Sequence, residues 1–153
     1  MGSIKHAINR KKLRPRILLV GRLMVLNKKK EFLVVQRSSN DRYRPGMWEL
    51  PGGKLDEGQD VSDTLHREVL EETSLKIKIT VPLVYYQSGI SKEGKYKGLT
   101  YVRMFGIAEC LSGNVVLSHE HENFAWIEMN SISKYEITSE CKQAIEFLNN
   151  REM

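Results

Sequence analysis

Residues Gly52 to Leu75 read GGKLDEGQDVSDTLHREVLEETSL and determine most of what can be inferred about this chain. They join a pair of glycines to a predicted helix that carries Glu68, Glu71 and Glu72. Spacings of three and four residues place these carboxylates on one face of a helix. Like charges so close repel one another, and a hard divalent cation such as Mg²⁺, which takes oxygen ligands, would relieve that repulsion. The stretch therefore predicts a metal site.

The same stretch contains the signals that begin and pack the helix. Asp60 is a favourable N-cap, so the helix is expected to begin near it. Val61, Leu65 and Val69 recur every four residues and form an apolar stripe beside the acidic face. The helix can therefore bury one side against a core while its carboxylates lie at the rim of a cleft.

The segments around this helix predict a mixed sheet. Apolar runs bounded by turn residues are expected to form strands at 17–26, 31–37, 47–50, 76–87, 99–110, 115–117 and 124–128. The first two strands form a hairpin, and an amphipathic helix is expected at 138–150. Strands and helices in this order predict the α/β (α+β) class, with helices packed on a mixed sheet.

Composition indicates one ordinary globular domain. The chain has 153 residues, of which 41% are hydrophobic and 28% charged. No apolar run approaches the ~20 residues of a membrane span, and no secretory signal is recognisable, so we expect a cytoplasmic protein without membrane contact. Cys110 and Cys141 lack a metal-binding spacing and are expected to be reduced in that compartment.

The net charge of +5 is concentrated at the N-terminus. Six basic side chains and no acidic one lie in the first 16 residues: Lys5, Arg10, Lys11, Lys12, Arg14 and Arg16. Removing these six from the 24 basic residues leaves 18, against 19 acidic residues. We therefore expect a basic, solvated arm at 1–15 and one domain at 16–153, and nucleic acid is not an expected partner.

The spacing of the residues in this stretch resembles a known family motif. Gly53, Gln59 and the run from Arg67 to Leu75 resemble the Nudix box, matching seven of its nine defined positions, and the preceding Trp48–Gly53 segment is typical of the entry to that box. The resemblance implies a Nudix-type α/β/α sandwich over roughly residues 16–150. It also implies hydrolysis of a nucleoside diphosphate linked to a further moiety, with Mg²⁺, or Mn²⁺, as cofactor.

The resemblance also implies roles for individual residues. Glu68, Glu71 and Glu72 would be catalytic metal ligands. Arg67 would orient these carboxylates, and its position four residues before Glu71 suits an ion pair. The carbonyl group of Gly53 would add a metal ligand, and Gly52 would help to form the turn beside the substrate.

Two positions depart from the family pattern. Gln59 replaces a glutamate that supports the metal site, so it can offer a carbonyl oxygen but no charge. Ser74 replaces a glycine that ends the helix in the left-handed conformation, at a cost of about 1 kcal/mol. Neither change removes the three glutamates, so weaker metal binding is expected rather than loss of the site.

The general base has more than one candidate. In the family it is a box glutamate, here Glu68, or a glutamate from a later loop. Residues 118–122 form such a loop, in which Glu120 is our first candidate and Glu122 the second. His119 and His121 are expected to be solvated loop residues, since their spacing does not match a helical metal motif.

Three residues outside the helix are candidates for substrate binding: Arg37, Trp48 and Gly52. In several Nudix proteins an arginine at the place of Arg37 contacts phosphates, although a solvated residue at a strand end is an equal alternative. Trp48 and Tyr43 can stack on a base, while packing in the core is the simpler expectation for Trp48.

The subgroup that matches best is the MutT-like (deoxy)nucleoside triphosphate pyrophosphohydrolases, which release a nucleoside monophosphate and pyrophosphate. Residues Ser88 to Ser91 lack the proline that marks ADP-ribose hydrolases. Arg37, Arg42 and Gly46 partly resemble the signature of coenzyme A pyrophosphatases, which is the main alternative. A non-catalytic nucleotide-binding domain, and hydrolysis of RNA 5′ ends, are further alternatives. Nudix proteins are often dimers, so a homodimer is also considered.

Overall fold

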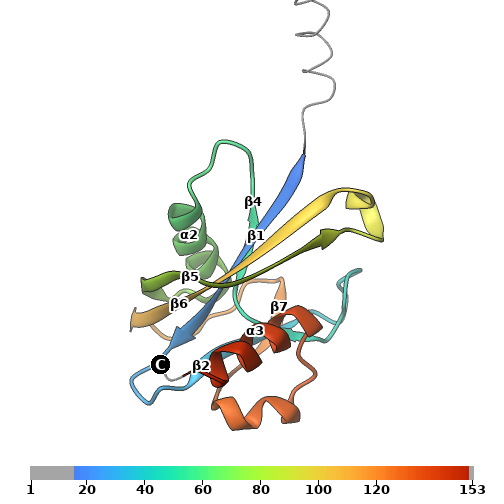
Figure 1. Ribbon diagram of the computed structural model, residues 1–153. Helices are drawn as coiled ribbons and strands as arrows, with labels where there is room; N and C mark the ends of the chain where they lie inside the picture. Colours follow the sequence, from blue (N-terminus) through green and yellow to red (C-terminus); the bar gives the residue numbers. More distant parts are fainter. Residues whose placement is uncertain (1–15, 152–153) are drawn as a thin grey trace, which may run out of the picture.

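The computed structural model describes residues 16–151, and the expected basic arm at 1–15 lies outside them. The elements follow one another along the chain as β1 Ile17–Leu26, β2 Phe32–Arg37, β3 Trp48–Glu49, β4 Gly52–Leu55, α2 Val61–Thr73, β5 Lys76–Ile90, the 3₁₀ turn η1 Gly94–Tyr96, β6 Thr100–Ser112, β7 His121–Ile127, the 3₁₀ turn η2 Met129–Lys134 and α3 Ser139–Asn149 (Figure 1). No helix within the described residues is long and apolar enough to cross a membrane.

The strands form one mixed sheet in the order β3-β2-β1-β6-β5. β1 and β2 make the expected hairpin, with Leu26 opposite Phe32, while β1 pairs in parallel over its whole length with residues 100–109 of β6. The short strand β4 pairs with residues 19–22 in the middle of β1, and β7 pairs with β2. The predicted mixed sheet is confirmed.

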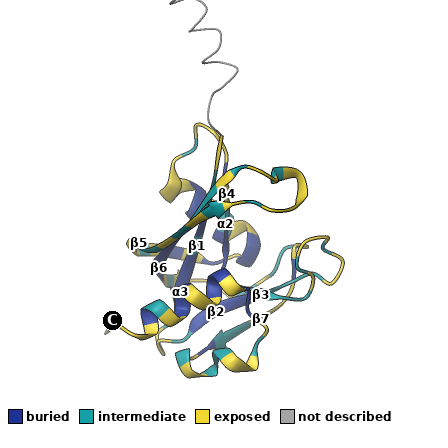
Figure 2. Cartoon of the chain, turned by 45° about the vertical axis from the view of Figure 1, so that its right-hand side comes forward, coloured by how far each residue is buried: buried dark blue, intermediate teal, exposed yellow. Residues whose placement is uncertain are grey.

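The sheet buries both of its faces, because alternate residues of the central strand β1 point in opposite directions. Leu23 and Val25 pack with Leu65 and Val69 of α2. Met24 packs on the other side, in the core that contains α3. The two helices thus cover opposite faces, with their buried residues turned inward and their exposed residues outward (Figure 2). This arrangement is the expected α/β/α sandwich.

The signals at both ends of α2 act as the sequence predicts. The Asp60 side chain accepts a hydrogen bond from the backbone N–H of Asp63 at 3.0 Å, so it caps the first turn. Ser74 ends the helix with φ of 66°, in the left-handed region, and its N–H donates to the carbonyl group of Leu70. Its hydroxyl group also donates to the carbonyl group of Val116 at 3.1 Å, which offsets part of the conformational cost.

Several strand boundaries differ from the expectation, and one predicted strand is wrong. Residues 115–117 form no strand. Val115 and Leu117 pack against the α2 side of the core without pairing, which explains their apolar pattern. The segment instead follows the end of α2, where Val116 and Ser118 donate backbone hydrogen bonds to Thr73 and Glu72. The last strand also begins at His121, three residues before the predicted start.

The apolar stripe of α2 is shorter than predicted. Leu65 and Val69 are buried, but Val61 in the first turn is 37% exposed. The buried apolar stripe therefore begins at Leu65, one turn into the helix. The three glutamates lie in the C-terminal half of the helix.

Candidate active site

The paired glycines of β4 bring the backbone against the carboxylates of α2. Gly53 pairs with Gly21 of β1. A Cβ atom added to Gly53 would lie 2.9 Å from the carboxyl carbon of Glu68, so only glycine leaves room for this approach. One residue earlier, the N–H of Gly52 donates to Glu72 at 3.3 Å. The structure thus places Gly52, Gly53, Glu68 and Glu72 in one group.

This close approach leads to a first prediction. In Gly53→Ala the new methyl group should displace the Glu68 side chain, while the strand keeps its register because the φ of Gly53 is not in the left-handed region. We expect the hydrolytic rate to fall at least about tenfold, since such sites tolerate little displacement, with a thermal midpoint near that of the wild type. Lys54→Ala, which removes an exposed neighbouring side chain, is the control. Equal rates for Gly53→Ala and the wild type would contradict the proposed position of Glu68.

The carboxylates of α2 lie where ionisation is unfavourable without a cation. Glu72 is only 6% exposed. Burial raises its pKa to about 8, against the opposing effects of Arg22 and the Gly52 N–H, and Glu49 and Glu120 raise it further. Burial also raises the pKa of Glu68, and repulsion from Glu71 adds to that effect. A bound cation would offset burial and repulsion and would favour the ionised form of both carboxylates.

These oxygen donors fit a hard divalent cation, although they do not form a complete cage. Within residues 16–151 no three histidine, cysteine, aspartate or glutamate side chains are arranged to hold a metal ion by themselves. Mg²⁺ keeps several water ligands and takes only one or two carboxylates. Glu68 and Glu72, with the backbone of the glycine strand between them, match that requirement.

Arg67 lies where the sequence placed it. Its guanidinium group is 3.5 Å from Glu68 and 3.7 Å from Glu71. Both ion pairs are partly exposed, so each contributes little to stability. Their effect is to limit the orientations that the two carboxylates adopt.

Gln59 lies at the other end of the helix. Its side-chain oxygen accepts hydrogen bonds from the N–H of Asp56 at 2.9 Å and from the Thr64 hydroxyl group at 3.4 Å. Its carbonyl oxygen is used to hold the loop before α2, and its role at a metal stays a prediction.

The structure distinguishes the two candidate bases near β7, Glu120 and Glu122, by their surroundings. Glu120 lies close enough to raise the pKa of both Glu68 and Glu72, although burial is the main cause for each. Glu122 is turned elsewhere, since its carboxylate accepts hydrogen bonds from the N–H and hydroxyl groups of Ser39 at 3.2 Å. The geometry therefore favours Glu120 over Glu122.

A buried charge cluster beside this site was missed in the sequence. We call the side chains of Arg22, Arg37, Glu49 and His121 the Glu49 cluster. Glu49 is 4% exposed and forms an ion pair with Arg22 at 3.2 Å. It also accepts hydrogen bonds from Arg37 at 3.1 Å and from Nε2 of His121 at 3.0 Å. These partners come from β1, β2 and β7, so one carboxylate joins the strands around the site.

The expectation of a solvated His121 is wrong. This side chain is 6% exposed, and its Nδ1 atom is buried without a hydrogen-bond partner among the described residues. The period-two pattern of a strand is the signal that could have revealed it, because His121 has the same parity as the buried Ile127. The reason for the error is the strand start, which was placed three residues too late.

The ionised forms of Glu49 and Arg22 are strongly favoured in the Glu49 cluster. Burial alone would raise the pKa of Glu49, but attraction to Arg22 and the hydrogen bond from His121 lower it to about 2, with a further contribution from Arg37. Burial opposes the charge on Arg22, yet Glu49 and Glu72 raise its pKa overall. Arg22 also donates to the carbonyl group of Leu50 at 2.7 Å. Arg22 lies opposite Gly52 in the β1–β4 pair, which links the cluster to the acidic face.

The remaining candidates for substrate binding are held by protein partners. Besides Glu49, Arg37 contacts Asp41 at 2.6 Å and the carbonyl group of Tyr43 at 2.8 Å, so it is neither free nor merely solvated. Trp48 packs edge-on against Tyr135 at 5.0 Å and borders the α3 core. These contacts give both residues structural roles, and substrate contacts by them stay predictions.

The fold and the glycine–glutamate site together define a class of protein. The family model described as NUDIX domain matches residues 16–148. The chain therefore belongs to the Nudix family, and the expected hydrolysis of phosphoric anhydride bonds is confirmed.

Individual relatives agree with this assignment. Nucleoside triphosphatase NudI from Escherichia fergusonii is 26% identical over 118 residues, which cover 69% of this chain and 79% of that protein. The RNA pyrophosphohydrolase from Pelagibacter ubique is 29% identical over 127 residues, covering 72% and 76%. The crystal structure of a MutT protein from Methanosarcina mazei superposes with a TM-score of 0.62 at 25% identity, covering 90% of this chain and 98% of that chain.

Proposed function

We propose that this chain hydrolyses (deoxy)nucleoside triphosphates to a nucleoside monophosphate and pyrophosphate in the presence of Mg²⁺. The observation that supports it most is the placement of Glu68 and Glu72 against the glycine strand, where burial and repulsion disfavour their ionisation unless a cation is bound. Phosphoryl transfer requires charge neutralisation and an aligned nucleophile more than covalent help from the protein.

The residues of α2 and the glycine strand would have different roles in this reaction. A bound Mg²⁺ ion would neutralise the charge of the polyphosphate. Glu68, Glu71 and Glu72 would hold that ion, with the carbonyl group of Gly53 as an additional ligand. Arg67 would keep the first two carboxylates oriented through its ion pairs.

Glu120 would act as the general base. A water oxygen forms a bond to phosphorus, its proton passes to the Glu120 carboxylate, and the bond from phosphorus to the bridging oxygen breaks. The electron pair of that bond leaves with pyrophosphate. The electrostatic influence of Glu120 on Glu68 and Glu72 supports its position near the reacting phosphate.

Glu120, in the loop before β7, and Glu122, within β7, give a matched test. Glu120→Gln should lower kcat by about a hundredfold or more, within the usual contribution of a general base, and leave the thermal midpoint near that of the wild type because Glu120 is exposed. Glu122→Gln removes the same charge two residues away and should keep near-wild-type activity, since that side chain contacts Ser39. Initial rates at saturating substrate measure both. Equal rates in the two variants would mean that Glu120 is not the base.

A substrate panel tests the proposed reaction. Nucleoside triphosphates, deoxynucleoside triphosphates, coenzyme A, ADP-ribose and a 5′-triphosphate RNA would be incubated separately with Mg²⁺ or Mn²⁺, and the products resolved by chromatography. Because one relative is named an RNA pyrophosphohydrolase, the RNA belongs in the panel. We expect nucleoside triphosphates to give the highest kcat/KM. Turnover of coenzyme A or RNA alone would overturn the proposal, and turnover of no compound would favour a binding domain.

The same measurements can use the variant Glu71→Gln/Glu72→Gln as a background. That variant keeps the size and shape of both side chains but removes two charges. Activity that survives the double change would come from a contaminant or from another site.

A further inference from the structure

β5 is the outermost strand on one side of the sheet, and β6 is its only strand partner within the part of the chain that the structure describes. The opposite edge of β5 therefore presents backbone N–H and C=O groups that no neighbouring described strand receives. Proteins usually protect such an edge with charges, proline or bulges, because it can pair with another chain. The two halves of β5 differ in this protection.

The first half of the edge is interrupted. Pro82 has no backbone N–H to donate, and the pairing with β6 shifts register on both sides of Val81. The second half has neither device. From Tyr85 to Ile90 the pairing with β6 is continuous, and residues 79–91 include no charged side chain. This second half is therefore an edge that can accept a further strand.

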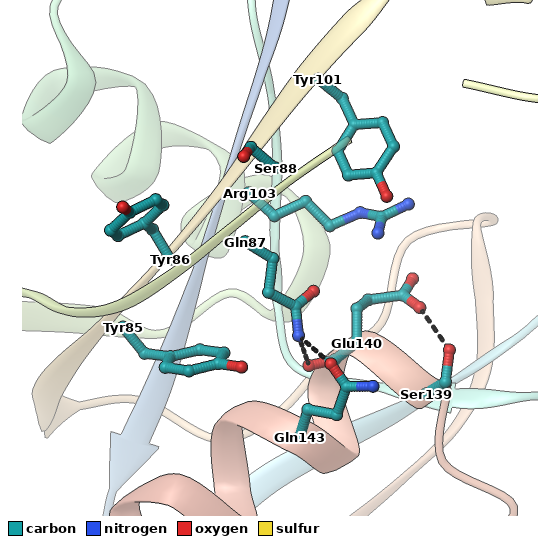
Figure 3. Close-up of a pocket in the computed structure, with 9 residues that line it drawn as sticks. All are labelled: Tyr85, Tyr86, Gln87, Ser88, Tyr101, Arg103, Ser139, Glu140 and Gln143. Atoms are coloured by element: carbon teal, nitrogen blue, oxygen red, sulfur yellow. Dashed lines mark hydrogen bonds between the residues drawn. The ribbon is translucent and has the colours of Figure 1, made fainter. Parts of the chain in front are cut away.

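The side chains on the α3 side of this second half already contact the helix. Tyr85 packs against Phe147, with the ring centres 4.8 Å apart. The amide group of Gln87 donates to Gln143 at 2.6 Å. A polar pocket of about 400 Å³ lies on the same side, between β5, β6 and the start of α3 (Figure 3). The protein's own helix thus covers this side of the strand.

The alternate side chains, those of Tyr86, Ser88 and Ile90, are on the other side of the strand. Figure 3 shows Tyr86 turned away from α3. Its side chain is 64% exposed and that of Ile90 is 62% exposed, and both are large and apolar. These two side chains are therefore available to pack against a partner.

The backbone groups of the same three residues point toward the outer edge. The N–H of Ser91 donates to the carbonyl group of Leu99, on the β6 side, at 2.9 Å. Successive residues of an antiparallel strand direct their N–H and C=O groups to alternate edges. Residues 86, 88 and 90 therefore direct theirs to the edge opposite β6, where a further strand would receive them.

We propose that residues 85–91 of β5 pair with the same segment of a second copy of this chain, antiparallel, about a twofold axis at Ser88. In that register Tyr86 of one copy lies opposite Ile90 of the other, and aromatic and β-branched side chains are favourable cross-strand partners. The outward N–H of each Ser88 donates to the carbonyl group of the other Ser88. The two sheets then form one continuous sheet with a self-complementary interface.

The charge pattern favours a second copy as the occupant of this edge. In a symmetric pair each residue meets the same segment, so a charge within it would lie near its own like-charged copy. Residues 79–91 avoid that repulsion, while Lys78 and Lys92 lie immediately outside them. A charged strand from another protein would find no opposite charge along this edge.

Two substitutions at Ser88 give a matched test. Ser88→Pro removes the outward N–H but keeps the bonds to β6, because proline is tolerated on an edge strand at such a position. Ser88→Ala keeps the N–H and is the control. Sedimentation equilibrium at about 10 and 300 µM measures the dissociation constant of the dimer. We expect similar constants for the wild type and Ser88→Ala. The constant for Ser88→Pro should be about tenfold higher or more, because two symmetric hydrogen bonds are lost.

Tyr86→Lys/Ile90→Lys tests the same pairing through the side chains and decides the question if Ser88→Pro fails to fold. Both positions are exposed, so the thermal midpoint should stay near that of the wild type. The two new charges would lie directly opposite one another across the interface, so the dissociation constant should rise about tenfold or more. Asn149→Lys/Asn150→Lys adds the same charges at exposed positions at the end of α3 and is the control.

A wild type that stays monomeric at the higher concentration would overturn the proposal and leave the edge to another occupant. A dimer with the same dissociation constant in the wild type, Ser88→Pro and Tyr86→Lys/Ile90→Lys would overturn it as well, because the interface would then lie elsewhere. These measurements report molecular mass and need no substrate. Failure of this proposal and failure of the proposed reaction are therefore distinguishable.

Discussion

Glu72→Gln is expected to abolish hydrolysis and at the same time to make the metal-free protein more stable at pH 8. The loss of rate should be at least about a hundredfold, because the variant removes a charge that would hold the catalytic cation. The gain in stability follows from burial. Glu72 is almost fully buried, and its pKa is raised to about 8.

The direction of the pH effect follows from this raised pKa. Above pH 4.5 the unfolded chain releases the Glu72 proton, whereas the folded protein keeps it until about pH 8. Folding therefore becomes less favourable as the pH rises between these values. Glutamine has no proton to lose, so the variant should gain stability over the wild type through that window, by roughly 2–5 kcal/mol at its upper end.

Chemical unfolding in metal-free buffer at pH 4.5, 6 and 8 measures this effect. The two proteins should have similar free energies of unfolding at pH 4.5 and should diverge as the pH rises. Added Mg²⁺ should stabilise the wild type and not the variant, since only a ligand that binds the folded state shifts its stability. A variant that is less stable than the wild type at pH 8 would contradict the conclusion that burial and nearby carboxylates raise the pKa of Glu72.

Glu49→Gln should have the largest effect on folding. Arg22, Arg37 and His121 all contact this carboxylate, and its replacement leaves a buried arginine without a charged partner. Removing one member of a buried ion pair typically costs about 3–5 kcal/mol. We expect a loss of that size in the free energy of unfolding at pH 7.

The effect should depend on pH in the opposite sense to that of Glu72. The folded pKa of Glu49 is lowered to about 2, so its contribution is complete above pH 4.5 and is lost as the pH falls toward 2. The difference between wild type and variant should therefore shrink below pH 4.5. Asp56→Asn, which removes an exposed carboxylate, is the control. A Glu49→Gln protein with wild-type stability at pH 7 would show that the cluster does not hold the strands together.

Local signals predicted the parts of the fold that depend on neighbouring residues. The helix begins directly after Asp60 and ends at Ser74, because capping is a contact between residues close in sequence. The first strand has the predicted bounds, since its apolar run is uninterrupted except at Gly21 and Arg22. Spacing along one helix likewise placed Glu68 and Glu72 on one side, next to Gly53.

Contacts between distant segments could not be predicted in this way. Glu49 and His121 are 72 positions apart and meet only because β3 and β7 both pair with β2. The polar pocket depends on the packing of α3 across β5 and β6. One signal was present: Arg22 interrupts an apolar strand, and an arginine buried in a sheet requires a carboxylate partner.

The products of nucleoside triphosphate hydrolysis test the central claim most directly. The wild type and Glu72→Gln would be incubated with the same triphosphate and Mg²⁺, and the products resolved by chromatography. We expect nucleoside monophosphate and pyrophosphate from the wild type and almost none from the variant. Release of these products by both proteins at equal rates, or of nucleoside diphosphate and orthophosphate by the wild type, would contradict the assignment of this acidic face to pyrophosphate hydrolysis.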